Sequence, residues 1–157
     1  MELKDFSANI RQHADDCYRQ MPLMNAILGG KLTQEELRKH ARRHYAEIRT
    51  FIDFKLPERL RICPHDAYSA KKFFWDIYCE EQGNFVPGKN HAELFKPFCY
   101  KLGITDEELD DEYAAYWPHY RDMLSAVTSR PALVRELAIS FAWETIGILN
   151  EMCKMIA

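Results

Sequence analysis

Two glutamates that fall within apolar helical stretches constrain the fold of this chain most. Glu81 shares a helical face with an apolar stripe, because residues three, four and seven positions apart lie together on a helix. That stripe consists of Phe74, Ile77 and Tyr78. Glu144 lies in the most apolar stretch, residues 133–156. A carboxylate on a buried face must be neutralised, paired or bound to a metal, so the fold must bring such partners to both glutamates.

The hydrophobic pattern is helical nearly throughout, and no convincing strand pattern occurs. Helices are expected over residues 5–20, 33–57, 67–83, 90–103, a short stretch from 105, 116–128, and from 131 onward. Thr33 with Glu36 and Thr105 with Glu108 are predicted capping boxes, and Asn90 is a predicted N-cap. The sequence therefore predicts an all-α bundle of about seven helices that forms one domain, residues 1–157.

Composition limits the partners of this chain. Its net charge is −3 and it has no basic block, which argues against nucleic acid and anionic membrane surfaces. The start of the chain has no apolar run, and no stretch approaches the ~20 apolar residues that span a bilayer. The five cysteines are scattered without a C-x-x-C pair, as expected of reduced thiols. These features predict a cytoplasmic protein.

His91 adds an imidazole to the two carboxylates. It follows the predicted cap Asn90 and so lies in the first turn of its helix. Carboxylate and neutral imidazole together suit iron, manganese or zinc. The alternative for Glu81 and Glu144 is a buried glutamate that accepts hydrogen bonds from a serine, tyrosine or arginine. A histidine in a first turn is usually a surface residue, so each residue alone is ambiguous.

A second set of polar residues lies on one helix. His40, His44 and Glu47 are spaced at i, i+4 and i+7, which places them on one face. Lysine and arginine neighbours favour a charged surface for His40. Glu47 lies at the border of the apolar stripe and is a candidate for a third inward carboxylate.

The order of several motifs resembles a known family. The motifs are Arg43-His44-Tyr45-Ala46-Glu47-Ile48, Glu80-Glu81-x-Gly83-Asn84, Asn90-His91-x-x-Leu94-Phe95 and Phe98-x-x-x-Leu102-Gly103. They resemble the haem-oxygenase-like helical bundle of thiaminases and pyrroloquinoline-quinone synthase. More narrowly, they are similar to the haem-oxygenase-like di-metal oxidases, and the similarity covers nearly the whole chain at low identity.

The resemblance implies roles for individual residues. Glu81 and His91 match the ligands of the first metal-binding helix, Glu144 matches the carboxylate of the second, and Glu47 matches an additional glutamate in some members. Trp143, Tyr78 and Tyr45 are expected near the substrate pocket, with core packing as the alternative. The implied cofactors are two Fe(II) ions, or iron with manganese, and O2 is the implied co-substrate.

One part of the family pattern has no counterpart here. The family draws further Asp and His ligands from a third core helix beyond Glu144, which we expect to lie beyond Ala157. The expected function is an oxidase or oxygenase that acts on a small amine, amino acid or fatty acid. The alternatives are a metal-free enzyme of the same fold and a non-catalytic helical interaction module, and analogy suggests a homodimer.

Overall fold

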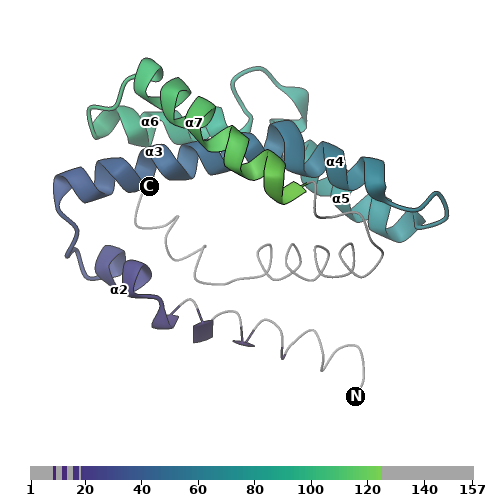
Figure 1. The fold of residues 1–157 in the computed structure, drawn as a ribbon, viewed down its shortest axis with the longest axis horizontal. Helices are drawn as coiled ribbons and strands as arrows, with labels where there is room; N and C mark the ends of the chain where they lie inside the picture. Colours follow the sequence, from purple (N-terminus) through teal and green to yellow (C-terminus); the bar gives the residue numbers. More distant parts are fainter. Residues whose placement is uncertain (1–8, 10–11, 14–15, 18, 125–157) are drawn as a thin grey trace. The chain divides into compact units, whose positions relative to one another are not determined.

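The computed structural model describes residues 9, 12–13, 16–17 and 19–124. These residues form helices joined by turns, and no strand occurs among them, so the all-α prediction is confirmed (Figure 1). The elements are α2 (Pro22–Leu28), α3 (Gln34–Thr50), the π-helix η1 (Phe51–Lys55), α4 (Leu56–Ile62), α5 (Tyr68–Glu81), the 3-10 turn η2 (Gly83–Phe85), α6 (His91–Lys101) and α7 (Asp106–Leu124).

These elements belong to two compact units. α2 belongs to the first, and α3 to α7 belong to the second. The sequence did not predict α2, which begins at Pro22, where a proline is tolerated because the first-turn amide needs no partner. The single domain expected over residues 1–157 stays a prediction. Among the described residues, no helix is both long and apolar enough to cross a lipid bilayer.

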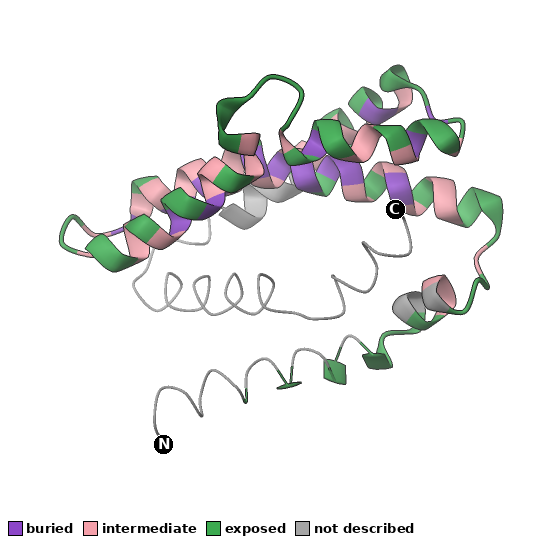
Figure 2. Cartoon of the chain, turned by 180° about the vertical axis from the view of Figure 1, so that it is seen from behind, coloured by how far each residue is buried: buried purple, intermediate pink, exposed green. Residues whose placement is uncertain are grey.

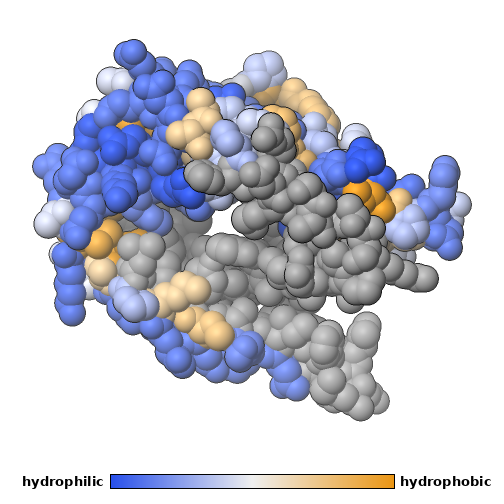
Figure 3. Space-filling model, viewed as in Figure 1, coloured by the Kyte–Doolittle hydropathy of each residue, from blue (hydrophilic) through white to orange (hydrophobic). Residues whose placement is uncertain are grey.

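Within the second unit, α3 is the central helix. Its apolar stripe consists of Ala41, Tyr45 and Ile48, and Ile52 of η1 continues it; all four are buried at helical spacing. α6 and α7 pack against this stripe, and Figure 2 shows buried residues concentrated along α3. Leu109 of α7 and Cys99 of α6 are fully buried in the same core. Of the residues that are coloured in Figure 3, most are hydrophilic, and the hydrophobic ones form small separate groups.

The chain stays helical past Pro57, where the sequence pattern predicted an end. A π-helical turn over Phe51–Lys55 precedes the proline, and the amide of Leu56 donates to the carbonyl of Phe51 five residues earlier. Proline has no amide hydrogen to continue an α-helical ladder, and its ring crowds the preceding turn. The wider π turn shifts the register of the backbone hydrogen bonds just before Pro57. Pro57 therefore lies in the first turn of α4, where a proline is tolerated.

Caps fix where α6 and α7 begin. The Asn90 side chain accepts a hydrogen bond from the Glu93 amide at 2.8 Å, which confirms the predicted N-cap. Thr105 and Glu108 form the predicted reciprocal capping box, with hydrogen bonds of 2.9 and 3.2 Å. The predicted break before residue 116 does not exist, because α7 is one helix that continues through Pro118. The sequence pattern there had suggested two short helices.

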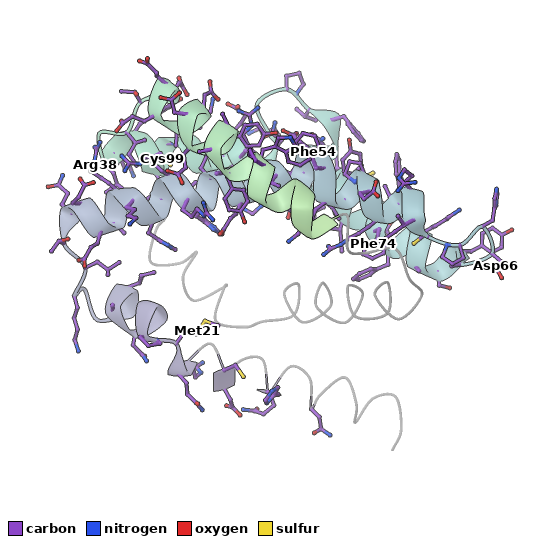
Figure 4. The ribbon with its side chains drawn as sticks, viewed as in Figure 1. Met21, Arg38, Phe54, Asp66, Phe74 and Cys99 are labelled. Carbon is purple, nitrogen blue, oxygen red and sulfur yellow. The ribbon has the colours of Figure 1, made fainter. Side chains whose placement is uncertain are left out.

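Ion pairs join the beginning of α7 to α3. Glu108 Oε1 accepts from Arg38 Nη2 at 3.0 Å and from Arg42 Nη1 at 3.1 Å. Arg38 also donates through Nη1 to the carbonyl of Leu102 at 2.6 Å, at the end of α6. Figure 4 labels Arg38 on α3. One arginine therefore ties three helices together at this end of the unit.

Candidate metal centre

Glu81 and His91 come together at the junction of α5 and α6. Glu81 is the last residue of α5, and His91 is the first residue of α6. His91 Nδ1 lies 2.7 Å from Glu81 Oε2. The Glu81 side chain is 17% exposed and that of His91 is 50% exposed. A mostly shielded glutamate side chain thus meets a half-exposed imidazole.

Helix geometry explains why Glu81, and not Glu80, is turned inward. Glu81 shares its face of α5 with Phe74 and Ile77, which are both buried. Glu80 is exposed, as its helical neighbours predicted. The packing of the apolar stripe therefore sets the direction in which the Glu81 carboxylate points.

Glu47 is held in a charged cluster on the surface of α3. Its side chain is 48% exposed and lies 3.8 Å from Arg43 and 3.7 Å from His44 Nδ1. Partial burial raises the pKa of the Glu47 carboxyl, but the hydrogen bond and charge of His44 and the charge of Arg43 outweigh it, so the pKa lies below its ordinary value. Glu47 is thus ionised at neutral pH, and in this arrangement its partners are the Arg43 guanidinium and the His44 imidazole.

The histidines of α3 lie beside α6. The rings of His40 and His44 are nearly parallel, with centroids 6.0 Å apart, and His44 meets the edge of Phe95 at 5.1 Å. Burial, and then the neighbouring His44, lower the pKa of His40, so its imidazole is neutral at pH 7. Phe95 lies one turn after His91 on α6. This face of α3 therefore packs, through His44 and Phe95, against α6, the helix that carries His91.

The two expected pocket tyrosines have different surroundings. Tyr45 is 1% exposed and belongs to the core cluster between α3, α6 and α7. Tyr78 is half-buried one turn before Glu81, with its ring against Trp75 at 5.9 Å and Phe85 at 6.0 Å. Tyr78 also accepts a hydrogen bond from Gln82 at 3.2 Å. Of the two, Tyr78 lies nearer to the Glu81–His91 pair along the chain.

The two side chains of the pair carry donor atoms of the kinds that bind iron. A carboxylate oxygen and an imidazole nitrogen are both suitable iron ligands. Among the residues that the structure describes, no group of three or more His, Cys, Asp or Glu side chains is placed to hold a metal ion. Glu144 and Trp143 lie outside the described residues. The described geometry therefore brings two of the four predicted ligands together.

Sequence reasoning missed two features at α5 and its end. The first is the backbone after Glu81, where Gly83, Asn84 and Phe85 all have positive φ angles. Gly83 directly after Gln82 was the available signal, since glycine commonly follows a helix in the left-handed conformation. The second is Arg59, which is 4% exposed beneath the same face of α5, over the rings of Phe51 and Phe74. No local pattern marks an arginine for burial.

Comparison with known proteins adds independent information. A family model described as an iron-containing redox enzyme matches residues 33–154, a range that includes Glu81, His91 and Glu144. A 4-aminobenzoate synthase of Chlamydia trachomatis serovar D is 32% identical over 81 residues, and one of Chlamydia muridarum is 31% identical over 81 residues. Each match covers 52% of this chain and 32% of the relative, so the chain matches about a third of those proteins' length.

No solved structure matches the chain significantly. The family model covers most of the sequence, including the whole segment from α3 to α7. It supports the helical bundle and the oxidoreductase class that the sequence predicted. The chain belongs to the family of iron-containing redox enzymes with the haem-oxygenase-like fold.

Proposed function

We propose that this chain is an oxidoreductase that holds two iron ions, or iron with manganese, and uses O2 to oxidise a small amine, amino acid or fatty acid. The observation that carries the proposal is the Glu81–His91 pair at 2.7 Å, within a chain of the iron-containing family. Glu144 is the proposed carboxylate of the second metal-binding helix, and Glu47 is a proposed additional ligand. Similarity to 4-aminobenzoate synthases supports the oxidase class without choosing the substrate.

The chain's own residues would prepare the site in two ways. Glu81 supplies an anionic oxygen that is largely shielded from water, which strengthens its attraction for a cation. A carboxylate only accepts hydrogen bonds, so the hydrogen in the pair belongs to His91 Nδ1. If Nδ1 held a metal it would carry no hydrogen, and the neutral imidazole would then carry its hydrogen on Nε2.

The bound metal would supply the electrons that O2 needs to react with an organic substrate. The protein's remaining task is to orient the substrate and to limit access of water. Tyr78 and its aromatic neighbours Trp75 and Phe85 form the described apolar surface closest along the chain to Glu81. We propose that this cluster contributes to the substrate pocket, together with Trp143.

Anaerobic Fe(II) binding tests the proposal directly. Wild-type protein and the variants Glu81→Ala, His91→Ala and Glu144→Ala are titrated with Fe(II), and bound iron is measured after removal of free metal. We expect each variant to weaken binding tenfold or more. Glu80→Ala is the matched control, because Glu80 is an exposed glutamate one residue from Glu81, and it should bind iron as wild type does.

Exposure of the iron-loaded protein to O2 provides the second measurement. We expect a change in visible absorption in wild type and Glu80→Ala, and none in Glu81→Ala or His91→Ala. Wild-type protein that binds no iron would refute the proposal and favour a metal-free enzyme or an interaction module of the same fold. Equal binding by wild type and Glu81→Ala would refute the assigned ligands.

A further inference from the structure

The connecting loop between the two metal donors, residues 82–90, has an unusual backbone. Three consecutive residues adopt left-handed conformations, with φ angles of 59° at Gly83, 53° at Asn84 and 61° at Phe85. Such angles are uncommon outside glycine, and they are unfavourable for a bulky residue such as phenylalanine. The strain persists only where surrounding contacts fix the conformation, and such strain gathers at functional sites.

Hydrogen bonds hold this turn in place. The Phe85 amide donates to the Gln82 carbonyl at 3.1 Å, and the Val86 amide donates to the Gly83 carbonyl at 3.1 Å. Farther along, the Lys89 amide donates to the Val86 carbonyl at 3.0 Å. The loop is thus closed on itself by successive short turns, and it returns the chain to Asn90, the cap of α6.

Gly83 is where the two ends of the loop meet. A Cβ atom built on Gly83 would lie 2.7 Å from Lys89 Cβ, and it would collide still more closely with the Lys89 carbonyl group. Gly83 is two residues after Glu81, and Lys89 is two residues before His91. The backbones therefore touch at a point equally distant along the chain from each metal donor.

We propose that Gly83 and the left-handed turn that it begins are positioning residues for the metal donors Glu81 and His91. The backbone contact between Gly83 and Lys89 sets how closely α5 and α6 approach at their facing ends, and so sets the distance between carboxylate and imidazole. This inference rests on the proposed function. It assigns a role to residues that would never touch the metal.

The size of the effect follows from metal geometry. Ligand distances in a metal site are fixed to within about 0.2 Å. A methyl group at Gly83 would have to push Lys89 away by more than that, because the collision is with backbone. Loss of the supporting structure around metal ligands typically lowers metal affinity 10–100-fold. We expect a loss of at least tenfold for Gly83→Ala.

The loop contains its own control. Gly88 also has a positive φ, +72°, but a Cβ at Gly88 would meet nothing within 4 Å. Gly83→Ala and Gly88→Ala therefore share the strain of an alanine in the left-handed region and differ in the collision with Lys89. Both variants are titrated anaerobically with Fe(II) and, separately, with Co(II), whose visible spectrum reports the ligand environment. We expect Gly88→Ala to bind both metals within about threefold of wild type, since alanine changes no contact there.

If Gly83→Ala does not fold, a second pair of variants tests whether the left-handed turn positions the metal donors. Asn84 is exposed, so substitutions there add no collision with the core. Asn84→Val disfavours the left-handed conformation because valine is branched at Cβ, whereas Asn84→Gly accepts it freely. We expect Asn84→Val to weaken Co(II) binding severalfold and Asn84→Gly to preserve it. Circular dichroism establishes which variants are folded.

The outcomes separate this inference from the proposed function. If wild-type protein binds neither Fe(II) nor Co(II), the proposed function fails and this inference fails with it. If wild type binds metal and folded Gly83→Ala binds it as tightly as Gly88→Ala does, the positioning role alone is refuted. Equal binding by Asn84→Val and Asn84→Gly would refute it in the same way.

Discussion

Phe74 offers the best test of the fold, because its buried ring packs α5, the helix that also carries Glu81, against the rest of the unit. Phe74, labelled in Figure 4, is fully buried. It lies two turns before Glu81 on the same face of α5. The Arg59 guanidinium lies 5.6 Å from the centroid of its ring. Truncation to alanine should cost about 3–5 kcal/mol, a large share of the ~5–15 kcal/mol that stabilises a typical domain.

Phe74→Leu is the more informative change. Leucine keeps most of the apolar volume, so the repacking should cost less than about 1.5 kcal/mol. It removes the ring face under Arg59, and a desolvated cation–π contact contributes about 1–2 kcal/mol. We therefore expect a total loss of about 2–3 kcal/mol in the free energy of unfolding. Phe51→Leu is the matched comparison, because Phe51 contacts the same guanidinium at 5.5 Å but is only half-buried.

The assay is urea denaturation followed by far-ultraviolet circular dichroism, as a double-mutant cycle of Phe74→Leu with Arg59→Met. The cycle isolates the interaction between the two side chains from the other contacts of each. We expect a coupling energy of about 1 kcal/mol. A coupling below about 0.3 kcal/mol, within the error of additive mutations, would show that the ring does not stabilise the buried cation.

Two further predictions concern stability within the second unit. Thr50 is 1% exposed, and its hydroxyl has no hydrogen-bond partner among the residues described. Thr50→Val should therefore raise the free energy of unfolding by about 1 kcal/mol. A lower thermal midpoint in the variant would contradict this reasoning. Glu108→Gln should lower the urea midpoint at pH 7, because the Thr105 amide, then Arg38 and Arg42, hold the pKa of Glu108 below its ordinary 4.5. That stabilisation is present above pH 4.5 and is lost as the pH falls through the depressed pKa of Glu108. The urea midpoints of wild type and Glu108→Gln should therefore converge in acid. A difference in midpoint that does not change with pH would contradict the ion-pair explanation.

Much of the fold could be predicted from local sequence signals. The N-cap at Asn90 and the capping box at Thr105 involve side chains and amides only three residues apart, so the sequence states them directly. Two predicted helix boundaries were wrong. Pro57 ends an α-helix only if the register before it is regular, and the π turn changes that register. α7 continues to Leu124 where the local pattern predicted separate helices.

The candidate site could be predicted in part. The inward direction of Glu81 follows from its spacing to Phe74 and Ile77, and the structure places both of those residues in the interior. The position of Glu47 could not be predicted, because a residue at the border of an apolar stripe turns toward whichever partners the neighbouring helices offer. In this structure those partners are Arg43 and His44, at the surface.

Local signals in the sequence are enough to predict that the described segments are helical, where α6 and α7 begin, and which face of α5 carries a carboxylate. Each of these depends on hydrogen bonds or contacts between residues a few positions apart. The 2.7 Å approach of Glu81 to His91 could not be predicted from such local signals, because the two residues lie on different helices and the left-handed turn at Gly83 lies between them. A locally unfavourable backbone is stable only when surrounding contacts fix it, and no hydrophobic or capping pattern in the sequence relates Gly83 to Lys89.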